Sequence, residues 1–297
     1  MDRRRFIHHS TFALGGLALA SQYSLSRFFQ ESWKITMLRK DTGIFTERGG
    51  TILFHLAKDG IVVVDSQFPD QSKHLIDELK KKSSQPFKLL INTHHHGAHS
   101  GGNIAFKGLV DHVLAHANSK INQQNASRNK NEEQQLYPDQ TFTHIWCEKF
   151  GKENICLRYF GPGHTNGDSL VHFQRADIVH MGDLLFNRRH PFVDRLAGAN
   201  ISNWIKVLDK AADTFNKKTL YVYGHAASGY EVTGTWEDLK RFGDYLGRLL
   251  QFTESEIKSG KSKEEILKNT ELPGETQWKG DGFQQPLQAA YEELTNK

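Results

Sequence analysis

The chain has 297 residues, of which 24% are charged and 37% are hydrophobic, and its formal net charge is +4. This composition is typical of a globular protein with one large or two ordinary domains, and it excludes disordered, collagen-like and coiled-coil chains. The weak basic balance, without a stripe of Lys and Arg interleaved with aromatic residues, argues against a nucleic-acid partner. The 16 histidines are unusual, because histidine is the commonest metal ligand.

Residues 1–20 have the pattern of a targeting segment. Arginines at 3–5 precede a short apolar stretch that ends in a small-x-small cleavage site at 18–20. The pattern resembles the twin-arginine signal, which is an address for export and not an anchor. The apolar stretch is too short and too rich in glycine to span a bilayer. We therefore predict a signal peptide over 1–20 and one mature domain over 21–297.

These features imply partners and a location. The twin-arginine export machinery would carry the folded protein, and the mature chain would be periplasmic or secreted in a bacterium. After cleavage it would keep no stable membrane anchor. An uncleaved N-terminal anchor, or arginines present by chance, is the alternative interpretation.

Short β-branched runs predict strands, and apolar residues at helical spacing predict helices. In chain order, strands are expected at 51–54, 60–65, 88–92, 110–115, on both sides of 150–153, and at 169–173, 178–181 and 220–223. Helices are expected at 71–83, 201–215, 235–250, 254–269 and 285–296, while 118–135 is either an exposed helix or a mobile loop. The strands do not alternate strictly with helices. This order argues against a doubly wound parallel sheet and favours two β-rich halves, each covered by helices.

The two cysteines, Cys147 and Cys156, flank a predicted hairpin turn. A two-residue turn at Gly151-Lys152 would place the two cysteines opposite each other. Two interpretations remain open, a cross-strand disulfide or two thiols on a buried strand face. No CxxC spacing occurs, so a zinc site with thiolate ligands is not supported.

The most informative segment follows the strand expected at 88–92. His94, His96 and His99 occur at spacings of two and three, and neighbouring glycines permit a tight backbone. A loop beyond a strand end can turn these three imidazoles inward together, with His95 pointing away. Taken alone, the segment could equally be a cluster of surface histidines.

Three other predicted strands end in a similar way. His164 lies in a glycine-rich turn, Asp183 follows Gly182, and His225 follows Gly224. Four strand ends thus carry a metal-type ligand beside glycine. Three histidines with an open position make a catalytic zinc set, and an aspartate with further histidines could hold a second ion.

The order of the motifs HxHxxH, GxGHTxGD, GD and GH over residues 50–225 resembles the metallo-β-lactamase superfamily of metallohydrolases. The resemblance implies an α+β fold, a four-layer αββα sandwich with metals at one edge of the sheets. It also implies a role for each motif residue. By motif, the first metal site corresponds to His94, His96 and His164, the second to His99 and His225, and the bridging carboxylate to Asp183; Asp183 and His225 are the expected catalytic residues.

The chain departs from the family pattern at Ala98. The pattern HxHxDH has an aspartate there, which ligates the second metal and orients the attacking hydroxide. A methyl group does neither, so we expect a weakened second site. The consequences that remain open are a working site with fewer ligands, a single-metal enzyme or an inactive descendant.

The leading hypothesis is metal-assisted hydrolysis of a small-molecule substrate, a lactone, ester, thioester or amide such as a β-lactam. One or two zinc ions are expected, ahead of iron or manganese. A mononuclear iron enzyme similar to the persulfide dioxygenases of the superfamily is one alternative. A metal-binding protein that lost catalysis through Ala98 is another.

Several neighbouring residues have two interpretations. Asp65 and Asp168 would either accept a hydrogen bond from a ligand imidazole or cap a turn. His180 would support the Gly-Asp turn or simply be structural. The loop after Asp183 would either lie at the entrance to the metal site, which we call the mouth, and select an anionic substrate there, or merely be exposed. Its basic residues are Arg188, Arg189 and His190.

Overall fold

The structure is a computed structural model that describes residues 33–128 and 131–295. The part of the chain from Lys34 onward forms one compact unit. The predicted signal peptide lies outside the described residues. Among the residues described, no helix is both long and apolar enough to cross a bilayer.

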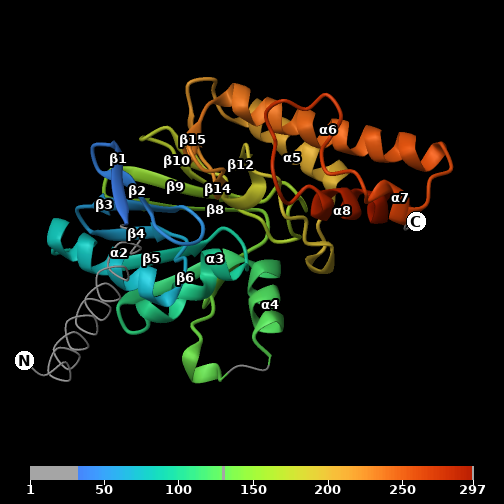
Figure 1. Cartoon of the computed structure of the whole chain (residues 1–297). Coiled ribbons are helices and arrows are strands. Elements are labelled where there is room, and N and C mark those ends of the chain that lie inside the picture. Colours follow the sequence, from blue (N-terminus) through green and yellow to red (C-terminus); the bar gives the residue numbers. More distant parts are fainter. Residues whose placement is uncertain (1–32, 129–130, 296–297) are drawn as a thin grey trace, which may run out of the picture. The chain divides into compact units, whose positions relative to one another are not determined.

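The first sheet has seven strands in the order of the chain. Strands β1 to β4 pair antiparallel, and strands β4 to β7 pair parallel, because helical segments connect these later strands. In Figure 1 this sheet runs from blue to green. Its strands are β1 (Lys34–Arg39), β2 (Thr42–Thr46), β3 (Ile52–Ala57), β4 (Gly60–Val64), β5 (Phe87–Asn92), β6 (Val110–His116) and β7 (Gln140–Phe142).

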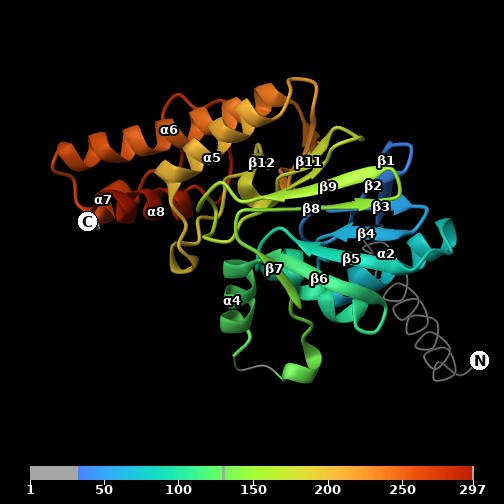
Figure 2. The same cartoon turned by 180° about the vertical axis from the view of Figure 1, so that it is seen from behind.

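The second sheet has six strands in the order β15-β13-β11-β10-β9-β8. Figure 2 shows β8 and β9 lying across the first sheet. Strands β12 and β14 form a separate two-stranded pair. In the chain, β12 follows Asp183 closely and β14 begins at His225. The strands are β8 (Ile145–Phe150), β9 (Glu153–Arg158), β10 (Leu170–Phe173), β11 (Ile178–His180), β12 (Phe186–Asn187), β13 (Leu220–Val222), β14 (His225–Ala226) and β15 (Thr233–Gly234).

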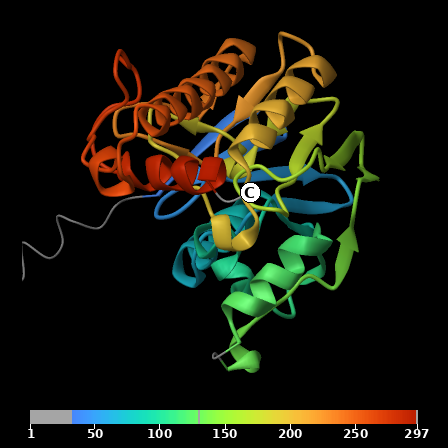
Figure 3. The same cartoon turned by 90° about the vertical axis from the view of Figure 1, so that its right-hand side faces the viewer.

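Helices cover the outer face of each sheet, as the view along the sandwich shows (Figure 3). The first sheet is covered by α2 (Pro69–Lys82), α3 (Gly97–Ser100) and α4 (Ala117–Ala126). The second is covered by α5 (Ile201–Thr214) and α6 (Trp236–Lys258), and α7 (Lys263–Ile266) and α8 (Gln284–Thr295) pack against α6. Short 3₁₀ helices lie at Gly101–Phe106, Glu132–Gln134, Gly182–Leu184 and Arg195–Ala197. The expected four-layer αββα sandwich of the α+β class is therefore confirmed.

Two apolar clusters hold the layers together. One fills the space between the sheets, with side chains such as Leu53, Val62 and Val171 from alternate strand positions. The other lies between the second sheet and its helices around the fully buried Trp204. Complete burial of one aliphatic side chain such as Leu53 contributes about 1.5–3 kcal/mol to the stability of the fold. The buried faces therefore fix the stacking order of the layers.

Most predicted elements lie within a few residues of the observed ones, and the differences have local causes. The β1–β2 hairpin was not predicted, because Lys34–Arg39 is a largely exposed edge strand without a clear alternation. The helices expected at 235–250 and 254–269 are wrong in their division: α6 runs unbroken to Lys258, and the second helix is only α7. The polar stretch 118–135 contains α4 and a 3₁₀ helix in its described part.

The hairpin of β8 and β9 has the predicted register, and Cys147 pairs with Cys156 in a disulfide. The structure thus decides between the two interpretations of the cysteines. The bond closes a loop with a sequence separation of 9 residues. It joins a sheet-edge strand to its neighbour.

Replacing both Cys147 and Cys156 with serine is expected to lower the free energy of unfolding by about 2–3 kcal/mol, because the unfolded chain regains the entropy of the open loop. Denaturant unfolding of the oxidised protein and the double variant measures this difference. A reducing agent should destabilise the natural protein and leave the variant unchanged. Equal unfolding free energies would contradict the expectation.

Candidate metal centre

The metal-type residues meet because four strands end at the same edge. Strands β9 and β11 both pair antiparallel with β10, and β13 pairs parallel with β11, so the carboxyl ends of β9, β11 and β13 lie together. In the other sheet, β5 ends at Asn92, directly before the histidine segment. The loops after these strands carry all six predicted site residues to one place.

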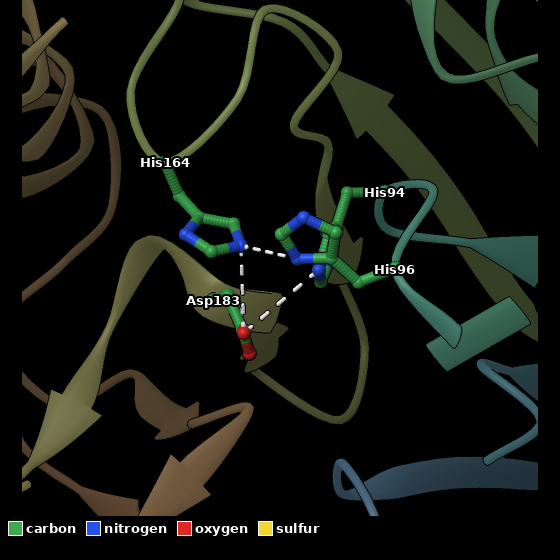
Figure 4. A group of neighbouring side chains, drawn as sticks. All are labelled: His94, His96, His164 and Asp183. Carbon is green, nitrogen blue, oxygen red and sulfur yellow. Dashed lines mark hydrogen bonds and ion pairs between the residues drawn. The ribbon is translucent and has the colours of Figure 1, made fainter. Parts of the chain in front are cut away.

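The first group consists of three imidazoles and one carboxylate, His94, His96, His164 and Asp183 (Figure 4). Their ligand atoms all lie within 4.8 Å of one another. His164 Nε2 lies 2.9 Å from His96 Nδ1 and 3.5 Å from Asp183 Oδ2, and His94 Nε2 lies 3.8 Å from the same oxygen. We call this group the three-histidine site.

The second group contains His99, His225 and again Asp183. Nε2 of His99 lies 3.0 Å from Asp183 Oδ1, and Nε2 of His225 lies 3.6 Å from it. The two imidazole nitrogens are 3.3 Å apart. Asp183 therefore directs one oxygen toward each group, and we call the second group the two-histidine site.

The donor set fits a cation. In the described part of the chain, His94 Nε2 is buried and has no hydrogen-bond partner, and it points toward Asp183 Oδ2 at 3.8 Å. Buried polar atoms are rarely left in this state unless water or an ion satisfies them. Imidazole nitrogens and a carboxylate that converge on one point are the usual ligands of zinc.

The protonation of the histidines also suits metal binding. Burial lowers the pKa of His164 to about 3 and of His225 to about 4, and burial together with the charge of His99 holds the pKa of His94 well below its usual value. These side chains are neutral at neutral pH, and neutral imidazole is the form that coordinates a metal.

His99 and Asp183 form the exception. Burial alone would lower the pKa of His99, but the carboxylates of Asp183 and Asp65 raise it to about 10. Burial alone would raise the pKa of Asp183, but the charge and the hydrogen bond of His99 hold it well below its usual range. A cation in the two-histidine site would take the place of the proton on His99.

Two carboxylates orient the ligand histidines from behind. Asp65 accepts a hydrogen bond from His99 Nδ1 at 2.7 Å, and it also accepts from the backbone N–H and the hydroxyl of Thr93. Its φ of 66° is rare for a residue other than glycine, so the backbone itself is set to aim this carboxylate. Asp194 lies 2.8 Å from His96 Nε2.

Asp65 was expected as one such acceptor, whereas the role of Asp194 was missed. Asp194 is 98 residues from His96 in the chain, and its only sequence signal is its place in the loop that follows Asp183. His95 lies outside both sites, as its Nε2 lies 3.5 Å from Asp194 instead.

The other candidate acceptors have structural roles. Asp168 caps its own turn, where both oxygens accept hydrogen bonds from Thr165, and it contacts no ligand imidazole. His180 accepts from Gly182 N–H and lies 2.9 Å from the carbonyl of Thr51, so it fixes the turn that carries Asp183.

Two glycines leave the room that the ligands need. A Cβ atom at Gly50 would collide with the ring of His99, and one at Gly224 would collide with Asp183 Oδ1. The glycines beside these motifs therefore allow the backbone to approach the site closely.

At the mouth, the three predicted basic residues separate. His190 is buried and lies 2.8 Å from the hydroxyl of Tyr245, so its placement at the mouth was wrong: it packs into the helical layer. Arg188 stacks over Trp278 at 4.9 Å. Only Arg189 is exposed, and its charge contributes to the lowered pKa of His225.

Comparisons with known proteins agree with this geometry. The sequence model described as "Metallo-beta-lactamase superfamily" matches residues 41–225. Metallo-beta-lactamase IND-1 of Chryseobacterium indologenes is 24% identical to this chain, and the alignment covers 63% of this chain and 76% of the relative. Metallo-beta-lactamase type 2 of Bacillus cereus is 26% identical, and the alignment covers 69% of this chain and 77% of the relative. Hydroxyacylglutathione hydrolase of Pelagibacter ubique is 34% identical over 44% of this chain and 48% of its own.

Solved structures show the same fold. The metallo-beta-lactamase from Pontibacter korlensis superimposes with a TM-score of 0.61 at 21% identity, covering 73% of this chain and 99% of its own. The crystal structure of metallo-beta-lactamase IND-7 superimposes with a TM-score of 0.60 at 18% identity, and the match covers 73% of this chain and 99% of that chain.

Proposed function

The chain belongs to the metallo-beta-lactamase superfamily, and from this premise we propose that it is a zinc-dependent hydrolase of a small substrate with a reactive carbonyl group. The observation that carries the proposal is the position of Asp183 between the two groups of imidazoles, with one carboxylate oxygen toward each. A site for a single ion, or a purely structural role, does not require a carboxylate that faces two groups of imidazoles.

The three-histidine site would hold the first ion through His94 Nε2, His96 Nδ1 and His164 Nε2. His99 and His225 would hold a second, with Asp183 between the two. Zinc fits this imidazole-rich set better than manganese, which prefers oxygen ligands. When bound, zinc supplies hydroxide at neutral pH and polarises a carbonyl.

The chain's own residues prepare this chemistry. Asp194 and Asp65 hold the rings of His96 and His99 in fixed orientations, which reduces the reorganisation needed on binding. His96 and His225 are the more exposed of the site imidazoles, so the substrate approaches from their side. Phe192 is 49% exposed and its ring lies 5.6 Å from that of His96, so it offers an apolar wall there.

Arg189 adds a positive charge near His225. A substrate that carries an anionic group next to its scissile bond would be attracted to this side of the site. Lactones, thioesters and β-lactams with a carboxylate are therefore the first substrates to test. The named relatives suggest a β-lactam and a glutathione thioester as two members of that set.

A metal-binding protein without turnover is the second candidate, and Ala98 favours it. Its side chain has no ligand atom, and its carbonyl is used by the backbone N–H of Gly50. A second ion would then have only the two imidazoles and Asp183 as protein ligands. A mononuclear iron enzyme that uses two histidines and Asp183 remains the third candidate.

We also propose export of the mature protein to the periplasm or beyond. The residues at 1–20 support it, and the disulfide between Cys147 and Cys156 is consistent with an oxidising compartment. Cleavage after residue 20 is checked by sequencing the N-terminus of protein recovered from the natural cell.

The function is tested on the purified chain by metal analysis and a hydrolysis panel of esters, lactones, thioesters and β-lactams. We expect one to two equivalents of zinc, hydrolysis of at least one class, loss of activity with a chelator and recovery with added zinc. Turnover that survives complete metal removal would overturn the proposal.

The remaining outcomes distinguish the other candidates. Iron, with oxygen uptake on a persulfide, would establish the iron enzyme. Bound metal with no turnover on the whole panel would establish the binding protein.

A further inference from the structure

A cavity lies at the end of the sandwich opposite the metal centre. Its walls come from the β1–β2, β3–β4, β8–β9 and β10–β11 turns, whereas the metal ligands follow the other ends of these sheets. Its volume is about 620 Å³, which is in the range of small-molecule sites. The proposed hydrolysis makes no use of it.

The cavity is lined by five cationic side chains, Arg39, Lys40, Lys58, Lys152 and Arg175. In the described part of the chain, none of the five forms an ion pair with a carboxylate. Only two carboxylates line the cavity, so five positive and two negative groups leave an excess of three positive charges. Even with Asp59 close by in the β3–β4 turn, the excess would be two.

One of those carboxylates is already occupied. Glu153 is buried and accepts hydrogen bonds from the backbone N–H groups of Arg175 and Ala176. It thereby fixes the β10–β11 turn that carries Arg175. The cavity wall is thus held in place by a buried contact, and it is not only a chance meeting of surface side chains.

Arg39 is also positioned in advance. Its Nε donates to the carbonyl of Ala176 at 3.2 Å, and Nη1 donates to that of Leu38 at 3.0 Å. The guanidinium therefore crosses from the first sheet to the second at the cavity, with its remaining N–H groups available to a ligand.

The floor of the cavity contains the imidazole of His55. His55 is only 7% exposed, and its ring packs on Phe173 between the sheets. Its Nδ1 lies 2.8 Å from the hydroxyl of Thr42, while its Nε2 makes no hydrogen bond within the described residues. When the hydroxyl of Thr42 donates to Nδ1, Nε2–H becomes a donor that a ligand in the cavity can use.

We propose that this cavity binds a small, multiply charged anion of the phosphate-ester class. Guanidinium groups match the oxygens of a phosphate as a fork, and an uncompensated set of lysines favours more than one negative charge. The donor at His55 lies deep between the sheets, where a compact ligand reaches it and a folded macromolecule does not. The site does not depend on the metal or on turnover.

The test is calorimetric titration of the full chain with inorganic tripolyphosphate at moderate salt. The natural protein is expected to bind one equivalent. Replacing Lys58 and Lys152 together with glutamine is expected to weaken binding at least about tenfold. Replacing Lys73 and Lys258 with glutamine removes the same charge from exposed positions on α2 and α6, and is expected to leave binding unchanged.

Two further variants locate the bound anion. His55→Asn is expected to weaken binding, whereas His164→Ala is expected to preserve it, because tripolyphosphate held by metal would depend on His164. Absence of binding, equal losses in the two double variants, loss in His164→Ala alone, or equally tight binding of citrate would each overturn the proposal. None of these results bears on the proposed hydrolysis.

Discussion

The His164→Ala variant is expected to lose stoichiometric zinc at the three-histidine site and to hydrolyse the substrate on the order of 10³-fold more slowly. In the natural protein, Nε2 of His164 is buried and lies 2.9 Å from His96 Nδ1 and 3.5 Å from Asp183 Oδ2. Without it, the site keeps only two imidazoles, His94 and His96, beside Asp183. Metal content and kcat/KM on the best panel substrate measure the effect.

Two control variants distinguish the loss of a ligand from the loss of an exposed imidazole or of a supporting residue. His144→Ala removes an exposed imidazole from the β7–β8 turn and is expected to change neither quantity. Asp194→Asn weakens only the support behind His96, for which a loss of roughly 10–100-fold is typical. Equal activity in the His164→Ala variant and the natural protein would remove the three-histidine site from the mechanism.

The sequence predicted the site residues because the information is local. Each of the motifs follows directly after a strand, and strands that run in the same direction in a sheet end at one edge. His164 and Asp183 therefore meet once the strand directions in the second sheet are known, and His94 joins them because β5 of the first sheet ends on the same side. The structure brings all six candidate residues together, and metal analysis of their variants is the test of their role as ligands.

The parts that were missed depend on contacts distant in the chain. Asp194 supports His96 only because the loop after Asp183 folds back over the histidine segment. His190 was considered for the mouth because it belongs to the loop that follows Asp183, with an exposed loop as the alternative, but its ring is buried beside the hydroxyl of Tyr245. The anion cavity has no motif at all, because four separate turns each contribute one or two of its cationic side chains.

The edge hairpin was missed for a different reason. Strand β1 has buried neighbours on only one side, so its sequence need not alternate, and pairing with β2 supplies its stability. Its end nevertheless positions Arg39 at the anion cavity. A segment with little sequence signal can thus carry a functional side chain.

Replacing Ala98 with aspartate is expected to raise the affinity for a second zinc ion, by at least the roughly 10–100-fold that a supporting residue contributes. The two-histidine site already has His99, His225 and Asp183 in place, and a fourth protein ligand is the usual complement of a closed zinc site. The three-histidine site should keep its affinity, since its donor atoms are unchanged. Zinc titration with a competing chelator resolves the two affinities.

Ala98→Asn is the matched control, because it has nearly the same size and shape as aspartate without its charge. If charge at this position controls the second ion, Ala98→Asn should resemble the natural protein and Ala98→Asp should differ from both. Turnover that appears only with aspartate would show that the natural chain binds metal without catalysis. Comparable turnover in all three would show that one ion is sufficient, whereas an unchanged second affinity in Ala98→Asp would mean that His99, His225 and Asp183 do not form a metal site.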